Sequence, residues 1–374
     1  MEQNTFDLVA GARPNFMKLA PLVRAFAAIE EELEARGLGW RIVHSGQHYD
    51  AAMNDVFFSE LGIPAPDVHL EVGSGTHGAQ TARIIERYER HLLENRPVAT
   101  VVFGDVNSTV ACALAAVKLA IPVLHVEAGL RSFDRTMPEE INRVLTDALS
   151  EMLFVSERSG MENLEREGVS GDRAYLVGNV MIDTLARELP RAAATGTAGR
   201  LGVEPGGYGL MTLHRPANVD NPGVLRPLLE LLVEFSRTLP VVFPVHPRTQ
   251  KAISEHGLDY LLKANGTLKC IPPLPYHENL SLMSQAKVVL TDSGGMQEET
   301  TYLGVPCLTL RPNTERPVTV THGTSRLVGN DPKNIAKALD DVMAGQWAKG
   351  QDIPLWDGKT SERIIRILVD RFSA

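Results

Sequence analysis

Residues 288–299 read V-V-L-T-D-S-G-G-M-Q-E-E, and this stretch indicates the fold. It starts with a short apolar run of the kind that is buried on both faces of a parallel sheet. The turn Ser293-Gly294-Gly295 follows, and a helix is expected directly after it. Glycine lets the chain approach a ligand closely, and the free N–H groups at the start of a helix bind phosphate oxygens. The stretch therefore predicts a strand–turn–helix unit with an anion-binding turn.

The same alternation of apolar strands and amphipathic helices runs through nearly the whole chain. Strand–helix–strand repetition predicts right-handed βαβ units and a doubly wound parallel sheet. Strands are expected at 6–10, 41–45, 100–103, 122–126, 152–155, 174–177, 210–213, 241–245, 268–271, 288–291 and 307–310. Helices are expected near 16–26, 81–93, 110–119, 225–235, 280–285, 296–302, 335–343 and 361–371.

The length of 374 residues suggests two domains. The most glycine-rich stretch without periodicity, 195–207, is the expected linker, and the strand–helix pattern restarts after it. We therefore expect an α/β protein with two Rossmann-like doubly wound domains that face a cleft. The N-terminal domain is expected at 1–180 together with the final helix at 359–374, and the C-terminal domain at 181–358.

Composition limits the possible partners. The chain has 37 Lys and Arg against 46 Asp and Glu, a net charge of −9, and no basic stripe of the kind that binds nucleic acid. The longest apolar stretch, 110–126, is interrupted by Lys118 and Pro122 and is too short for a membrane span. The three cysteines lie far apart, and the N-terminus shows no signal peptide. We therefore expect a soluble cytoplasmic protein without nucleic-acid or membrane partners.

Ligands of doubly wound sheets bind outside the carboxyl ends of the strands, so the loops after strands hold the candidate residues. The first such loop, G-A-R-P-N-F-M-K at residues 11–18, does not have the G-x-G-x-x-G pattern of dinucleotide-binding loops. Arg13 lies at the start of the next helix, where a cation opposes the helix dipole. Lys18 lies one turn further on. These residues are either two solvated charges or the two sides of an anion site.

Two carboxylates follow the next strands. Asp105 lies in G-D-V-N-S-T at 104–109, where it either caps the next helix or takes part in chemistry. Glu127 stands in H-V-E-A-G-L-R at the end of an apolar strand, where an unpaired carboxylate is costly. It is therefore either functional or paired with His125 or Arg131.

A third carboxylate, Glu139, starts the helix of P-E-E-I-N-R at 138–143, four residues before Arg143. This pattern fits ordinary helix-start chemistry as well as catalysis. In the second half, two strands end in a His-Arg pattern, His214-Arg215 and His246-x-Arg248. No H-E-x-x-H or similar spacing suggests a metal.

Taken together, the half that contains 288–299 predicts a nucleoside-diphosphate site. Glu299, about one turn into the helix, can reach a ribose diol, and Arg311 and Arg316 follow the next strand. The three carboxylates of the other half predict an acid–base site beside it.

These motifs, taken in this order, resemble those of one protein family. From Gly11 to about Gly329 the chain is similar to the non-hydrolysing UDP-N-acetylglucosamine 2-epimerases, which share a glycosyltransferase-B-like fold. The matching motifs are G-A-R-P-x-x-x-K, S-G-Q-H, F-G-D, H-V-E-A-G-L-R, P-E-E-x-N-R, V-G-N-x-x-I-D, L-H-R, D-S-G-G-x-Q-E-E and E-R-P. The resemblance implies reversible epimerisation at carbon 2 of UDP-GlcNAc to UDP-ManNAc, without a cofactor or metal.

The resemblance also implies roles for individual residues. The catalytic candidates are Asp105, Glu127, Glu139 and His214. The substrate-binding candidates are Arg13, Lys18, Arg143, the diphosphate cradle Ser293, Gly294 and Gly295, the ribose ligand Glu299, the uridine-side Arg316, and Leu274 and Asn279 in the loop 271–279 that matches the uracil pocket.

The implied partner is a UDP-N-acetylhexosamine, and the implied assembly is a homodimer in the cytoplasm with a role in polysaccharide biosynthesis. Four other functions stay open: an epimerase of a modified UDP-N-acetylhexosamine, a hydrolysing 2-epimerase, a UDP-sugar glycosyltransferase and a non-catalytic sensor. Incubation with UDP-GlcNAc and no acceptor separates the epimerase from the transferase, because only the epimerase forms a new sugar nucleotide.

Overall fold

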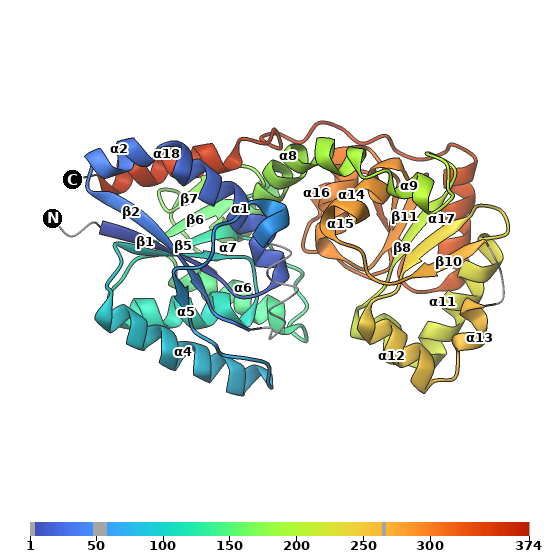
Figure 1. Cartoon of the computed structure of the whole chain (residues 1–374), viewed down its shortest axis with the longest axis horizontal. Helices are drawn as coiled ribbons and strands as arrows, with labels where there is room; N and C mark the ends of the chain where they lie inside the picture. The colour runs from blue at the N-terminus through green and yellow to red at the C-terminus, as the bar shows by residue number, and fades with distance from the viewer. Residues whose placement is uncertain (1–3, 48–57, 264–266, 374) are drawn as a thin grey trace. The chain divides into compact units, whose positions relative to one another are not determined.

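The computed structural model describes residues 4–47, 58–263 and 267–373. The chain divides into two compact units (Figure 1). The first unit comprises Met1–Ala186 and Pro354–Ala374, and the second comprises Arg187–Ile353. The domain boundaries given above stay a prediction, because compactness alone does not show independent folding.

The first unit contains a seven-stranded parallel sheet in the order β3-β2-β1-β4-β5-β6-β7. The central strands β4, β5 and β6 are buried along their whole length, as their continuous apolar sequence predicts. The strands are β1 (Asn4–Ala10), β2 (Leu38–His44), β3 (Val68–His69), β4 (Ala99–Phe103), β5 (Val123–Ala128), β6 (Met152–Val155) and β7 (Ala174–Leu176).

Helices cover both faces of this sheet (Figure 1). Helices α4, α5 and α6 pack side by side on one face, where Ile84, Tyr88 and Leu92 of α4 meet the alanines of α5. Helices α1 and α18 pack together on the other face. The helices of this unit are α1 (Arg13–Ala28), α2 (Glu30–Ala35), α4 (His77–Glu94), α5 (Asn107–Lys118), α6 (Pro138–Leu149), α7 (Arg158–Arg166) and α18 (Thr360–Phe372).

The second unit contains a six-stranded parallel sheet in the order β10-β9-β8-β11-β12-β13. Its strands are β8 (Gly209–Thr212), β9 (Val241–Pro244), β10 (Leu268–Ile271), β11 (Val288–Thr291), β12 (Cys307–Thr309) and β13 (Ser325–Leu327). Its helices are α9 (Thr197–Arg200), α10 (Pro216–Val219), α11 (Pro222–Phe235), α12 (Pro247–Glu255), α13 (Asp259–Leu262), α14 (Tyr276–Gln285), α15 (Gly294–Leu303), α16 (Val318–Thr321) and α17 (Pro332–Met343). The prediction of two Rossmann-like parallel sheets is confirmed.

The linker prediction was wrong. Residues 195–207 lie inside the second unit, where Gly196 adopts a left-handed conformation (φ 62°) and starts α9. The glycines of this stretch therefore serve tight turns within one unit. The division between the units falls instead inside α8 (Val180–Ala194), an amphipathic helix that carries no linker signal.

In each sheet the order of the strands reverses at one point, between β1 and β4 in the first unit and between β8 and β11 in the second. Loops that leave neighbouring strands diverge at such a switch point, which leaves room for a ligand. The loops that begin at Gly11 and Gly104 leave the first switch point, and those that begin at Leu213 and Asp292 leave the second. The predicted site residues therefore have a topological reason to gather there. Over the described part of the chain, no helix is long and apolar enough to cross a membrane.

Candidate active site

Glu127 forms a buried ion pair with Lys18 in the first unit. The Lys18 ammonium lies against Glu127 Oε2, and both side chains are more than nine-tenths buried. Lys18 comes from α1, which follows β1, and Glu127 from the end of β5, so the pair joins this helix to the strand next to β4. The pairing of Glu127 with His125 or Arg131, left open above, is not found, because both of those side chains contact Asp147 instead.

The backbone of Glu127 is strained. Its φ is 74°, in the left-handed region that few residues other than glycine adopt, and the pairing of β5 with β6 shifts register between Val126 and Ala128. Such a conformation costs on the order of 1–3 kcal/mol and persists only where the surrounding structure holds it. The bulge redirects a carboxylate at the end of a buried strand, as bulges beside active sites do.

Gly104 brings the loop after β4 close to this pair. Its φ is 61°, and a Cβ atom at this position would lie 2.5 Å from Lys18 Nζ. The left-handed backbone conformation favours glycine here, and a side chain at this position would also have to displace the end of Lys18. The next residue, Asp105, consequently starts its loop next to the Lys18–Glu127 pair.

Asp105 binds Arg143 rather than capping a helix. Its Oδ2 accepts hydrogen bonds from Nε and from a terminal nitrogen of Arg143, each at 2.9 Å. Val106 occupies the cap position of α5 without a side-chain hydrogen bond, so the cap interpretation of Asp105 was wrong. Asn142 donates from Nδ2 to the carbonyl oxygen of Asp105 at 2.9 Å. Helix α6 thus holds both the side chain and the backbone of Asp105.

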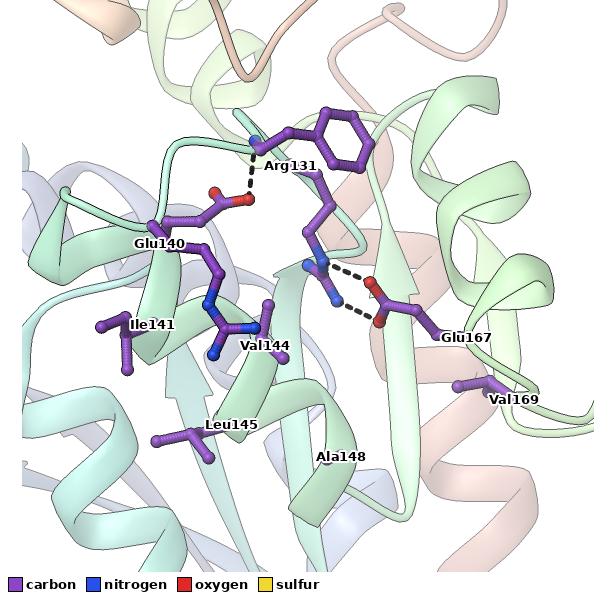
Figure 2. Close-up of a pocket in the computed structure, with 10 residues that line it drawn as sticks. Arg131, Glu140, Ile141, Val144, Leu145, Ala148, Glu167 and Val169 are labelled. Atoms are coloured by element: carbon purple, nitrogen blue, oxygen red, sulfur yellow. Dashed lines mark hydrogen bonds and ion pairs between the residues drawn. The ribbon is translucent and has the colours of Figure 1, made fainter.

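The two neighbouring glutamates of α6, Glu139 and Glu140, differ in their burial and in their contacts. Glu140 is buried and accepts hydrogen bonds from the backbone N–H groups of Ser132 (2.9 Å) and Phe133 (2.8 Å; Figure 2), and it also pairs with Arg143. Glu139 is half-buried and, within the described part of the chain, has no hydrogen-bond or ion-pair partner. Glu140 therefore orders the loop after β5, while a catalytic role of Glu139 stays a prediction.

Asn15 is a site residue that the sequence analysis missed. It is buried, donates from Nδ2 to Phe103 O at 2.9 Å, and accepts from the N–H groups of Gly11 and Ala12. It therefore ties the loop after β1 to the end of β4 across the switch point. Arg13 is the first residue of α1, as predicted, and its side chain lies outside what the structure describes.

In the second unit, Asp292 organises the loop that follows β8. Its carboxylate accepts hydrogen bonds from the backbone N–H groups of His214 (3.0 Å) and Arg215 (2.8 Å), from Asn218 Nδ2 (3.1 Å) and from His214 Nδ1 (2.8 Å). Burial alone would raise the pKa of Asp292, but His214 and these N–H groups outweigh it and hold that pKa below its ordinary value. An ionised Asp292 can only accept in its hydrogen bond with Nδ1, so Nδ1 carries the proton and Nε2 of the half-exposed His214 is the ring nitrogen left for a ligand.

The turn Ser293-Gly294-Gly295 leads into α15 at the carboxyl end of β11. A Cβ atom on Gly294 would lie 2.7 Å from Glu315 Oε1 and 2.8 Å from a terminal nitrogen of Arg316. Arg316 is buried and pairs with Glu298 (2.8 Å) and Glu315 (2.5 Å). The first N–H groups of α15, which have no partner inside the helix, therefore lie beside an arginine. An anion site at this turn stays a prediction, because in this structure two carboxylates hold the arginine.

Glu299 lies one turn further along α15 and is buried. Burial, together with the neighbouring Glu298, raises its pKa from 4.5 to about 7, although a hydrogen bond from Tyr276 acts in the opposite direction. Tyr276 OH donates to Glu299 Oε1 at 3.1 Å. Tyr276 is the first residue of α14, so the predicted uracil loop 271–279 is helical from Tyr276 on; Leu274 and Asn279 are half-buried. This tyrosine therefore connects the predicted uracil loop to the predicted ribose ligand, and the sequence analysis did not single it out.

The second His-Arg pattern has local structural partners. The ring nitrogen of His246 accepts the N–H of Arg248 and caps α12, and the Arg248 side chain pairs with Asp220 at 2.5 Å. Arg311 likewise pairs with Glu315 at 2.7 Å. These contacts account for these residues without a ligand.

A G-x-G-x-x-G run does occur at residues 73–78, which the sequence analysis overlooked. It follows the two-residue edge strand β3 rather than β1, away from the switch point. Arg83 donates to the carbonyl oxygens of Val72 (3.1 Å) and Ser74 (2.9 Å) and so holds this loop closed on itself. The run therefore lacks the position that a dinucleotide fingerprint needs. Among the described residues, no group of three or more His, Cys, Asp and Glu side chains could hold a metal ion.

The fold and these residues define a class: an α/β enzyme with two Rossmann-like units, one with buried and half-buried carboxylates near its switch point and the other with a glycine-containing turn at the start of α15 beside a buried arginine. Comparison with known proteins identifies the family. The family model for UDP-N-acetylglucosamine 2-epimerase matches residues 31–369. The chain belongs to this family, and it is an isomerase.

Individual relatives cover nearly all of the chain. A protein of Methanocaldococcus jannaschii named UDP-N-acetylglucosamine 2-epimerase is 43% identical over 367 residues, which cover 97% of this chain and 98% of that protein. A crystal structure of the UDP-GlcNAc 2-epimerase from the same organism, in complex with UDP-GlcNAc and UDP, superposes with a TM-score of 0.89 over 98% of this chain and 99% of that one, at 41% identity. A Pseudomonas aeruginosa protein named UDP-2,3-diacetamido-2,3-dideoxy-D-glucuronate 2-epimerase is 42% identical over 86% of this chain and 87% of its own.

Proposed function

We propose that this enzyme interconverts UDP-GlcNAc and UDP-ManNAc by inverting carbon 2 of the sugar. The family supports this reaction, and so does the set of carboxylates around the first switch point. Asp105, Glu127 and Glu139 come from three different elements, and the strained backbone of Glu127 is what carries the argument. Strain of this kind clusters at functional sites.

The chemistry explains why several acids are needed. The hydrogen on carbon 2 is not next to a carbonyl, so its direct removal would leave an unstabilised carbanion. We infer that UDP leaves first: the bond between carbon 1 and the phosphate oxygen breaks, and its electron pair goes to the diphosphate. The cation at carbon 1 makes the neighbouring hydrogen acidic, a carboxylate takes that proton, and the C–H electrons form a double bond between carbons 1 and 2.

This sequence leaves 2-acetamidoglucal and UDP. Return of a proton to the opposite face of carbon 2, followed by addition of UDP to carbon 1, completes the inversion. Two faces need two proton-handling groups or a reoriented intermediate, which explains the several carboxylates of the first unit. In the second unit, Arg316 and the N–H groups at the start of α15 would stabilise the departing diphosphate, and His214 either assists this departure or positions a carboxylate.

Proton NMR of the reaction with UDP-GlcNAc in D₂O tests this function. We expect UDP-ManNAc with deuterium at carbon 2, formed without an acceptor and without added nicotinamide or metal. Free ManNAc as the product would identify a hydrolysing enzyme instead. Product without solvent deuterium would exclude the elimination mechanism.

A second candidate substrate is a UDP-N-acetylhexosamine modified at carbons 3 and 6. The Pseudomonas aeruginosa relative, whose name specifies a diacetamido-glucuronate, is nearly as similar to this chain as the relative named for UDP-GlcNAc. Parallel assays with both sugar nucleotides decide between them, because the true substrate has the higher kcat/KM.

We also propose that the protein acts as a cytoplasmic homodimer. A surface pocket of about 510 Å³ lies along α6, and none of the four predicted catalytic residues lines it. Ile141 and Leu145 lie one turn apart on this helix (Figure 2), and the exposed Phe133 lines the same pocket. An apolar face of this kind suits a second copy of the chain. Light scattering should give twice the mass of the chain, and Leu145→Lys should lower it.

A further inference from the structure

Two buried side chains next to the acids, His125 and Asp147, have no role in the chemistry described so far. His125 is in β5, and Asp147 is in α6; both are almost completely buried. His125 Nδ1 lies 2.6 Å from Asp147 Oδ1, and its Nε2 lies 2.8 Å from the carbonyl oxygen of Gly104. The imidazole therefore bridges α6 and the end of β4.

Both ring nitrogens of His125 are engaged by oxygen atoms. A carbonyl oxygen only accepts, so His125 Nε2 donates to Gly104. Burial alone would raise the pKa of Asp147, but the charges and hydrogen bonds of His125 and Arg131 outweigh it and lower that pKa. The imidazole is therefore held from two sides, by a side-chain carboxyl group of α6 and by the backbone after β4.

The second oxygen of Asp147 reaches the other side of Glu127. Oδ2 accepts from the backbone N–H of Gly129 at 3.0 Å and pairs with Arg131 at 2.7 Å. The pair thus spans Glu127: His125 lies two residues before it in the chain, and Asp147 contacts Gly129, two residues after it. Through Gly104 it also contacts the residue directly before Asp105.

These contacts complete a pattern centred on α6. Glu139 is part of this helix, and Asp105 binds the helix through Arg143. Asp147, which also belongs to α6, holds the chain beside Glu127 by accepting from the N–H group of Gly129. We propose that His125 and Asp147 form a positioning pair that holds the strained backbone of Glu127 and the loop of Asp105 in register with α6. The proposal deepens the epimerase function and rests on it, because those carboxylates are the groups assigned to proton transfer.

Asp147→Asn is the sharpest variant for a test. The native carboxylate accepts from three partners, His125, Gly129 and Arg131, all of which donate. The amide of asparagine has nearly the same shape, but one of its two ends must present N–H groups to donors. The bridge therefore breaks without a large change in volume. His125→Gln is a second, milder variant, because its amide can still donate to Gly104.

Asp183 offers a matched control in the same unit. It is also a buried carboxylate that accepts several hydrogen bonds, from the N–H groups of Thr360 (3.0 Å) and Ser361 (2.7 Å) at the start of α18 and from Ser361 Oγ. Asp183→Asn should destabilise the fold without touching the loops that hold the acids.

The first readout is steady-state kinetics. We expect Asp147→Asn and His125→Gln to lower kcat about tenfold or more while KM stays within about twofold, and the double variant to be no worse than the more damaged single variant. Asp183→Asn should keep kcat. An unchanged kcat in Asp147→Asn and His125→Gln, or an equal loss in all three single variants, would overturn the proposal.

The second readout does not depend on the substrate. Amide hydrogen exchange should become faster at 104–108 and 127–129 in Asp147→Asn but not in Asp183→Asn. If wild-type protein fails to convert UDP-GlcNAc while exchange behaves in this way, the proposed function fails and the positioning pair stands. If wild-type protein is active and exchange at both segments is unchanged in Asp147→Asn, the positioning pair is wrong.

Discussion

His214 donates from Nδ1 to Asp292 Oδ1 at 2.8 Å, and Asp292 directly precedes the turn Ser293-Gly294-Gly295. One carboxylate therefore orients the imidazole and also supports the loop that begins the predicted diphosphate cradle. Because Asp292 fixes the proton on Nδ1, Nε2 is the nitrogen available to a ligand.

We expect Asp292→Asn to lower turnover by about 10- to 100-fold, because an amide no longer fixes the tautomer and orientation of His214. Affinity for UDP should change less than turnover. Steady-state rates from NMR and calorimetry with UDP measure the two effects separately. Wild-type turnover in Asp292→Asn would show that the orientation of His214 does not matter.

The buried pair Lys18–Glu127 allows stability to be separated from catalysis. Glu127→Gln leaves the Lys18 ammonium buried without its carboxylate, which should cost about 3–5 kcal/mol of folding stability. Turnover should fall about 10²-fold or more. The double variant Lys18→Met/Glu127→Gln removes both charges and should recover much of the stability but none of the turnover. Denaturant unfolding and NMR assays provide the measurements, and recovered turnover in the double variant would contradict a catalytic role for this pair.

Glu139→Gln should behave differently from Asp105→Asn. Glu139 is half-buried and has no partner among the described residues, so its substitution should leave stability within about 0.5 kcal/mol of wild type. Asp105→Asn loses an ion pair with the buried Arg143 and should destabilise the fold. Both variants should lose about 10²-fold or more in turnover. Thermal unfolding measures the stability of both variants, and steady-state kinetics measures their turnover. Full activity of Glu139→Gln would show that Glu139 has no catalytic role.

The raised pKa of Glu299 predicts the direction in which folding stability changes with pH. Its pKa rises from 4.5 to about 7 on folding, because burial disfavours the ionised form. Below about pH 4.5 the carboxyl is neutral in both states and contributes nothing. The folded state loses stability as the pH rises from about 4.5 to about 7, and the loss is complete above that range. The full cost is about 3.5 kcal/mol at about 1.4 kcal/mol per pH unit.

Glu299→Gln should therefore raise the melting temperature of the ligand-free protein at pH 8 and have little effect near pH 4.5. The substitution should also weaken binding of UDP, because Glu299 is the predicted carboxylate ligand of the ribose. Melting curves at both pH values and calorimetry with UDP test the two statements. A lower melting temperature of the variant at pH 8 would contradict the raised pKa.

The sequence predicted the strands and the switch-point loops well, because parallel strands buried on both faces leave continuous apolar runs. It missed β3 and β13, which are edge strands of two and three residues and too short to leave a periodic signal. Within the site, the carboxylates were recognisable because each follows an apolar strand or starts a helix. The residues that hold these carboxylates in place were not recognisable from the sequence.

Asn15, Asp147 and Asp292 contact groups that lie far away in the sequence, and no local pattern reveals such a contact. Glu140 was hidden beside Glu139, since position in the helix alone does not show which glutamate turns inward. Long-range hydrogen bonds, rather than local propensity, therefore decide how the predicted residues are held.

Gly294→Ala tests whether the turn before α15 must approach its neighbours closely. The added methyl group would lie 2.7 Å from Glu315 Oε1 and 2.8 Å from a terminal nitrogen of Arg316, so the arginine has to move away from the turn. We expect affinity for UDP to fall about tenfold or more, because the arginine and the N–H groups of the helix no longer converge on one anion. Gly199→Ala is the matched control: Gly199 lies in α9 with no atom within 4 Å of the added methyl group. That substitution should leave affinity unchanged and stabilise the protein slightly, since alanine favours a helix over glycine by about 0.5–1 kcal/mol. Calorimetry with UDP measures both variants, and equal affinities for the two would show that close packing of Gly294 against Arg316 plays no part in binding the nucleotide.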